Sequence, residues 1–157
     1  MPKVGILYVC TGKYPIFWPD FYESAEMLLL PDCEKTYLVL TDAQKLPNEE
    51  KANVKKFAQP HLGWPKATLL RYHMFRNIEH ELVKYDYLFF FNANIVFQAP
   101  VLAHQLLPVD EDFVAVNHIF TDRNKFPYEK NPASRAYIPP DQGTHYFMGG
   151  INGGKAS

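Results

Sequence analysis

Two short polar segments, each at the end of an apolar run, carry the side chains best suited to binding chemistry. Asn92, Ala93 and Asn94 follow the run 87–91, and residues 10–14 close the run 4–10. In open α/β sheets, ligands bind beyond the carboxyl ends of the strands. That rule points to both segments as candidate ligand sites.

The Asn92-Ala93-Asn94 segment places two amides at a spacing of two residues. If the backbone stays extended, both side chains point to the same side. An Asp-x-Asp here would hold a divalent metal that bridges a nucleotide diphosphate, but a neutral amide oxygen is a weaker ligand for such metals. The amide NH₂ can instead donate to phosphate or sugar oxygens. The alternative is a turn that uses the tolerance of asparagine for unusual backbone angles.

The elements that must position these segments are strands alternating with helices. Continuous apolar runs predict buried strands, and apolar residues at helical spacing predict helices. The alternation predicts an α/β fold, with a mostly parallel central sheet and helices on both faces. The predicted elements are strand 4–10, helix 19–30, strand 37–40, a helix from 65 to about 83, strand 87–91 and strand 113–116.

Three remaining segments lack a clear periodicity. Residues 43–58 are polar and predict a surface excursion, and residues 121–144 hold four prolines and predict a long loop. The glycine-rich stretch 147–154 is expected to lead into another element. The 157 residues suffice for one domain with a core and are too few for two comfortable ones.

Composition excludes several classes of protein. A formal net charge of −1 gives no electrostatic reason to expect nucleic acid or an anionic membrane as partner. No apolar run reaches the roughly 18 residues of a membrane span, and the start of the chain lacks the pattern of a signal peptide. Thirteen prolines and 15% aromatic residues suit a loop-rich surface with stacking platforms for sugars, although aromatic cores have the same composition.

Cys10 and Cys33 lie in or beside apolar segments without metal-ligand spacing. We expect both to be buried free thiols in a reducing compartment. With no span and no leader pattern, we expect a soluble, cytoplasmic protein.

Several segments together closely resemble the family-six glycosyltransferases, the group that contains the histo-blood-group A and B transferases, and especially their bacterial members. They occur in the family's order, with similar spacing, over essentially the whole chain. The segments are residues 8–14 (YVCTGKY), 24–26 (SAE), 63–65 (GWP), 87–94 (YLFFFNAN), 136–139 (AYIP), 148–150 (MGG) and 153–154 (GG).

The resemblance implies a GT-A-type fold in which a nucleotide-binding α/β half presents the donor to an acceptor-binding half. Members move galactose or N-acetylgalactosamine from UDP to the 3-position of a galactose-type acceptor and retain the α configuration. The positions that match the family's donor site are Val9, Cys10, Thr11, Tyr14, Trp64, Ala67, Arg71, Asn92, Ala93, Asn94, Met148, Gly149 and Gly150.

Among these positions, Arg71 matches an arginine near the diphosphate and the donor sugar. A fixed guanidinium there would counter the charge of leaving UDP and so support catalysis. Without the resemblance, Arg71 is interpreted as a solvated helix arginine. For Val9 and Cys10, the alternative is simple core packing.

The resemblance also bears on metals and on the donor sugar. Asn92 and Asn94 fall where animal members carry Asp-x-Asp, and bacterial members with asparagines look metal-independent, so we expect no metal and no other cofactor. Gly150 matches the residue that controls donor choice, where glycine leaves room for an acetamido group; we therefore favour N-acetylgalactosamine over galactose. Met148 argues mildly for galactose, and both glycines could merely satisfy a tight backbone.

The acceptor side is less defined than the donor side. His118 matches a histidine that touches the acceptor galactose, but Ile119 and Phe120 stand where the family has Pro-Gly. Pro127 replaces a threonine and removes its hydroxyl. For Glu129 and Asp141 we expect surface roles.

The catalytic residue is not assigned, because the family's glutamate belongs to a His-Asp-Glu-Ser segment expected beyond Ser157. We expect residues 1–157 to form a single catalytic domain that lacks its C-terminal third, either as a piece of a longer protein or as an inactive truncation. Two alternatives to an enzyme remain, a UDP or UDP-sugar binding module and a generic nucleotide-binding α/β protein. Against the last, the chain has neither a phosphate loop nor Gly-x-Gly-x-x-Gly.

Overall fold

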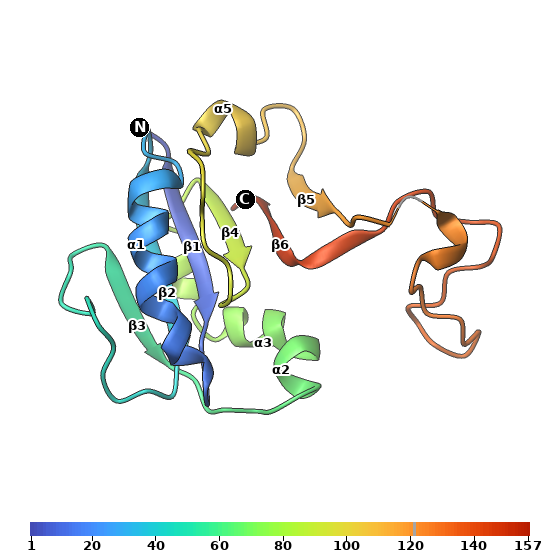
Figure 1. The fold of residues 1–157 in the computed structure, drawn as a ribbon, viewed down its shortest axis with the longest axis horizontal. Helices are drawn as coiled ribbons and strands as arrows, with labels where there is room; N and C mark the ends of the chain where they lie inside the picture. The colour runs from blue at the N-terminus through green and yellow to red at the C-terminus, as the bar shows by residue number, and fades with distance from the viewer. Residues whose placement is uncertain (121) are drawn as a thin grey trace.

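The computed structural model describes residues 1–120 and 122–157, and it contains one six-stranded sheet (Figure 1). The order across the sheet is β3-β2-β1-β4-β6-β5. The first four strands are parallel, whereas β6 is antiparallel to both β4 and β5. The prediction of a mostly parallel α/β sheet is therefore confirmed. The strands are β1 (Lys3–Val9), β2 (Glu34–Thr41), β3 (Val54–Ala58), β4 (Tyr87–Phe91), β5 (Phe113–Asn117) and β6 (Phe147–Lys155).

Helices cover both faces of this sheet because alternate strand residues point to opposite sides. On one face, α1 packs Trp18 and Phe21 onto Tyr8 and Tyr37, all fully buried. On the other face, apolar residues from α3 and the turn after it cover Leu7, Leu38, Leu40 and Phe90. The helical elements are η1 (Tyr14–Phe17), α1 (Trp18–Leu28), α2 (Lys66–Leu69), α3 (Arg71–Arg76), α4 (Glu79–Leu82), α5 (Ala103–Leu106) and η2 (Arg123–Lys125).

The single helix predicted from 65 to about 83 is wrong, because the segment is divided into α2, α3 and α4. Leu70 (φ −99°, ψ 11°) and Ile78 (φ −116°, ψ 22°) leave the helical region and separate the three pieces. The breaks let α2 run beside the end of the sheet while Met74 and Phe75 of α3 pack against its face. Apolar spacing alone did not reveal these breaks.

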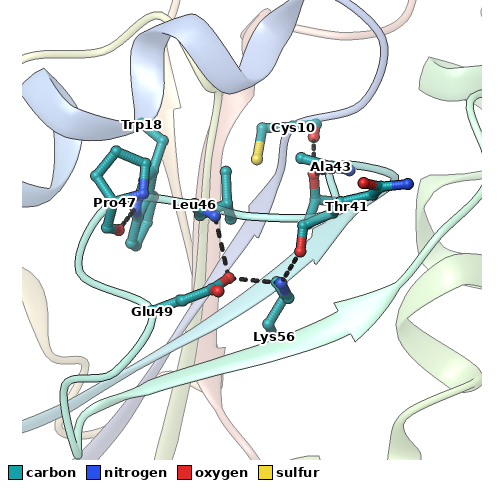
Figure 2. Close-up of polar contacts among 9 residues, drawn as sticks. Cys10, Trp18, Thr41, Ala43, Leu46, Pro47, Glu49 and Lys56 are labelled. Atoms are coloured by element: carbon teal, nitrogen blue, oxygen red, sulfur yellow. Dashed lines mark hydrogen bonds and ion pairs between the residues drawn. The ribbon is translucent and has the colours of Figure 1, made fainter.

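The surface excursion predicted for residues 43–58 is wrong for its last five residues, which form the edge strand β3. Charged side chains on an edge strand hide its apolar pattern and protect the sheet edge from pairing. Lys56 donates hydrogen bonds to the Gln44 carbonyl and the Glu49 carboxylate, and Glu49 also accepts from the Leu46 amide (Figure 2). The excursion that remains is thus tied to the sheet rather than loose.

The segment between β5 and β6 extends away from the sheet, as the orange part of Figure 1 shows. Apart from η2 and a bridge between Glu129 and Tyr137, its described residues form the long loop predicted for 121–144. Thr121, the first residue of that prediction, lies outside the described residues. The glycine-rich stretch 147–154 is itself most of a strand, β6, rather than a lead into another element. Its glycines permit close strand approach, since a Cβ on Gly153 would collide with the backbone of Leu88.

The structure also bears on the two cysteines and on membrane-spanning helices. Both cysteines are buried free thiols, as predicted. Burial raises the pKa of the Cys10 thiol to about 11, which keeps it protonated at neutral pH. Within residues 1–120 and 122–157, no helix has the length and apolarity needed to cross a membrane.

Candidate functional site

A cavity of about 430 Å³ opens at the carboxyl edge of β1 and β4, between the turns that follow these strands and the α2–α3 segment. Its volume falls in the range of small-molecule sites, and its position agrees with the rule for open α/β sheets. It is lined by Val9, Thr11, Tyr14, His61, Gly63, Trp64, Ala67, Thr68, Arg71, Phe90, Asn92, Ala93, Asn94, Gly149 and Gly150.

The turn after β1 is held by the turn after β2. The Thr41 hydroxyl donates to the Cys10 carbonyl (Figure 2), and the Gly12 amide donates to the Asp42 carboxylate at 2.9 and 3.1 Å. Gly12 has φ +66°, and a Cβ there would lie 2.8 Å from the ring of His61. Glycine is therefore favoured at this position for two reasons: its backbone conformation is left-handed, and the His61 ring leaves no room for a Cβ. The result is a fixed wall on the β1 side of the cavity.

His61 lines the cavity although the sequence analysis did not select it. Its Nδ1 lies 3.0 Å from the Thr11 hydroxyl, so the two side chains form a polar pair. The missed signal is positional, because His61 follows the carboxyl end of β3, the strand that the sequence pattern hid. Three further lining residues that the sequence analysis did not select are Gly63, Thr68 and Phe90.

The Asn92-Ala93-Asn94 segment forms a turn, so the extended backbone considered as one option is wrong. The chain leaves β4 at Phe91, and the Ile95 amide donates to the Asn92 carbonyl at 3.3 Å. Both asparagines nevertheless line the cavity. Ala93 is buried, and its carbonyl accepts a hydrogen bond from the Tyr8 hydroxyl at 2.9 Å, which fixes the turn to β1.

Arg71 is held in place at the cavity and is not a freely solvated helix arginine. Its Nη1 donates to the Gly149 carbonyl at 2.7 Å, and its guanidinium carbon lies 4.0 Å from the centre of the Phe90 ring. Burial lowers the pKa of the Arg71 guanidinium below its usual value, but arginine side chains are not deprotonated in proteins. A guanidinium fixed by a carbonyl and an aromatic face presents its remaining N–H groups in a defined direction.

Gly149 and Gly150 bring the start of β6 against the asparagine turn. The backbone amide of Asn92 donates to the Gly150 carbonyl at 2.8 Å. A Cβ on Gly150 would lie 2.8 Å from Asn92 Nδ2 and 3.3 Å from its Cγ. Gly150 is thus needed for the Asn92 side chain to occupy its position, whatever the cavity holds.

Three residues predicted from the resemblance do not line the cavity. Cys10 is fully buried in the core, as its alternative interpretation had it. Met148 is not among the lining residues, although its Cε lies 3.6 Å from where a Gly150 Cβ would stand. His118 belongs to the extended segment, where its ring lies 4.2 Å from that of Phe120. The acceptor role of His118 stays a prediction.

The charge in the cavity suits an anionic ligand. Arg71 supplies a cation, and no carboxylate occurs among the lining residues in the described part of the chain. In the same described residues, no group of three or more His, Cys, Asp or Glu side chains could hold a metal ion. Hard divalent cations favour several carboxylate oxygens, so the amides of Asn92 and Asn94 fit such an ion poorly. They fit oxygen-rich ligands that accept hydrogen bonds.

Comparisons with known proteins show which protein family resembles this chain. The model of glycosyltransferase family 6 matches residues 2–157. The O-antigen biosynthesis glycosyltransferase WbnI of Escherichia coli is 31% identical over 157 residues, which cover 98% of this chain and 66% of that relative. The chicken (Gallus gallus) globoside alpha-1,3-N-acetylgalactosaminyltransferase 1 is 29% identical over 164 residues, covering 96% and 46%. The rat (Rattus norvegicus) histo-blood group ABO system transferase 1 is 25% identical, covering 96% and 45%. The chain therefore spans less than two thirds of the length of these relatives.

Proposed function

The chain belongs to glycosyltransferase family 6, and from that premise we propose that its cavity binds a UDP-linked sugar for transfer to a glycan acceptor. Membership of the family implies a nucleotide-sugar donor and a glycan acceptor, and the sheet agrees with the GT-A fold of the family. Which sugar is moved, and to which acceptor, belongs to the proposal.

The observation that carries the proposal is the anchored guanidinium of Arg71 in a cavity lined by two amides. Of the five N–H donors of the guanidinium, one is used by Gly149. The others are available to diphosphate oxygens, together with the amides of Asn92 and Asn94. Charge-assisted hydrogen bonds of this kind stabilise the negative charge that develops on UDP as the sugar leaves.

For the reaction itself, we propose retaining transfer of N-acetylgalactosamine, or of galactose, to the 3-position of a galactose-type acceptor. The chicken and human relatives are named globoside alpha-1,3-N-acetylgalactosaminyltransferase 1, which supports this choice. Gly150 supports the N-acetyl donor because it adds no side chain to the cavity lining. Met148 matches a position at which methionine accompanies galactose transfer in the family, and it leaves galactose as the second choice.

We further propose that donor binding needs no metal ion and no other cofactor. The support is chemical, because Asn92 and Asn94 offer neutral amides where a divalent ion would favour carboxylates. The cytoplasmic location is kept as part of the same proposal, and cell fractionation of the untagged protein would test it.

A second candidate function is UDP or UDP-sugar binding without transfer. The observation in its favour is that the described lining residues include no carboxylate that could act as a base or nucleophile. On this alternative, Arg71 and the asparagines would bind the nucleotide in the same way, but no product would form.

An assay of transfer separates these functions. The full chain is incubated with UDP-N-acetylgalactosamine or UDP-galactose and a galactose-type acceptor, in chelator and in Mn²⁺, and glycan product and released UDP are measured. We expect product in chelator, with the N-acetyl donor used better. UDP binding without product would favour the second candidate, and a strict requirement for Mn²⁺ would contradict metal independence.

A further inference from the structure

Two hydrogen bonds join α3 to β6 in the part of the chain that the structure describes. Arg71 Nη1 donates to the Gly149 carbonyl at 2.7 Å, and the Tyr72 hydroxyl donates to Asn152 Oδ1 at 2.9 Å. The two donors are neighbours on α3, and their acceptors lie three residues apart on β6. The second contact has no part in the proposed function so far.

Asn152 connects these two contacts. Its Nδ2 lies 3.4 Å from the Gly149 carbonyl, the same oxygen that accepts from Arg71. Asn152 is only 9% exposed, so its amide depends on protein partners, and it has one on each side. The result is a continuous chain of hydrogen bonds from the Tyr72 hydroxyl through the Asn152 amide to the carbonyl that anchors Arg71.

The Gly149 carbonyl lies where the regular pairing of β6 ends, one residue beyond Gly150, whose carbonyl still accepts a hydrogen bond from the Asn92 backbone amide. The last residue of β6 paired with β4 on this side is Ile151, opposite Phe91. On the β5 side, the register is irregular between Ala115 and Asn117. A Cβ on Gly149 would meet no atom within 4 Å, so no packing restrains this peptide through a side chain.

Tyr72 and Asn152 lie outside the cavity that Arg71 enters. Both line a neighbouring apolar groove of about 330 Å³, which shares Phe90 with the cavity. Neither side chain lines the cavity itself, so an effect of either on a bound nucleotide must pass through Gly149 and Arg71.

We propose that Tyr72 and Asn152 are positioning residues for Arg71, which fix the Gly149 carbonyl and so aim the guanidinium at the diphosphate of the donor. This inference rests on the proposed function, because it requires a diphosphate beside Arg71. Neighbouring groups that orient a binding group commonly control its contribution.

Tyr72→Phe tests the inference, because it removes one hydroxyl and keeps the ring. By isothermal titration of the full chain, we expect the Kd for UDP to rise about threefold to tenfold, since the support of a single hydrogen bond is lost. The Kd for uridine, which lacks the diphosphate, is expected to stay unchanged. Asn152→Leu, which removes both amide contacts at similar volume, should have an effect on UDP at least as large. A melting temperature for each variant checks that it is folded.

Tyr22→Phe is the matched control. It removes the same kind of contact, from a tyrosine hydroxyl to an asparagine Oδ1 (Asn53, 3.2 Å), in a part of the core away from the cavity. We expect it to change the Kd for neither UDP nor uridine.

A double-mutant cycle with Arg71→Ala decides whether the effect passes through the guanidinium. In the Arg71→Ala background, Tyr72→Phe is expected to cause no further loss of UDP affinity. An effect of Tyr72→Phe that persists in that background, that is equal for uridine and UDP, or that is absent altogether would overturn the inference. If Arg71→Ala alone leaves UDP affinity unchanged, the proposed function itself fails, and the inference fails with it.

Discussion

The cavity and the segment 118–146 are built differently, although the resemblance gives each a role in substrate binding. The cavity walls are tied to the sheet, through Gly12 to Asp42 and through Asn92 to Gly150. The extended segment packs largely on itself, and the guanidinium of Arg123 donates to carbonyls within the same segment. We infer that the donor site inherits the rigidity of the sheet, whereas the acceptor side can change without disturbing it.

Phe126→Ala should destabilise the extended segment strongly, and it tests whether that segment and the cavity are structurally independent. Phe126 is 4% exposed and packs against Tyr128 and Tyr146. Truncating a buried phenylalanine costs about 3 kcal/mol or more, so amide hydrogen exchange within residues 122–146 should quicken strongly. We expect the Kd for UDP to stay unchanged. A parallel loss of UDP affinity would contradict the separation of the two regions.

A smaller effect is expected within the cavity from Gly150→Ala. Its Cβ would lie 2.8 Å from Asn92 Nδ2, so the substitution displaces that amide and should weaken binding of both UDP-sugars by about 1–3 kcal/mol, with the larger loss for UDP-N-acetylgalactosamine. The collision is removed in Asn92→Ala, which by itself should cost about 1–3 kcal/mol through a lost hydrogen-bond partner.

The pair of substitutions separates two roles of Gly150. In the Asn92→Ala background, any remaining discrimination caused by Gly150→Ala against the N-acetyl donor reflects direct crowding of its acetamido group. Competition binding with both donors measures this. An unchanged donor ratio in that background would remove the support that Gly150 gives to N-acetylgalactosamine.

The smallest change in stability is expected from acid pH. It should arise from an ion pair between α4 and β3 in the sheet domain rather than from the extended segment. Glu81 of α4 accepts hydrogen bonds from Lys55 of β3 and from Lys84, which lower the pKa of its carboxyl to about 2. Because the folded-state pKa is depressed, this stabilisation is present above the ordinary value for glutamate and is lost as the pH falls towards 2. Glu81→Gln should flatten the fall in melting temperature between pH 5 and about 2. An unchanged slope would show that this ion pair contributes nothing.

The central strands could be predicted from sequence because buried parallel strands are continuously apolar, as β1 and β4 are. The edge strand β3 could not, since Lys55 and Lys56 serve ion pairs at the surface instead of an apolar pattern. Missing β3 also concealed His61, which enters the cavity just beyond the end of that strand.

The donor site, like the sheet, has parts that the sequence could predict and parts that it could not. The turns after β1 and β4 were identified as candidate sites by the rule for open sheets, and both line the cavity. The anchoring of Arg71 could not be predicted from local pattern, because its acceptor Gly149 is 78 residues away in the sequence. The exclusion of Cys10 depends on which side of the chain its thiol faces, and that is decided by the packing of α1 on the sheet.

The cavity is proposed to bind a nucleotide diphosphate through Arg71 without a metal ion. Titration of the full chain with UDP in excess chelator tests it most directly, with Arg71→Ala as the variant and Arg76→Ala, on the same helix but outside the cavity, as the control. We predict saturable UDP binding that is weakened in Arg71→Ala by about 1.5–3 kcal/mol, the range for a hydrogen bond to a charged group, and unchanged in Arg76→Ala. Binding that appears only when Mn²⁺ is restored, or that is equal in the wild-type chain and Arg71→Ala, would show that the cavity does not bind the diphosphate in this way.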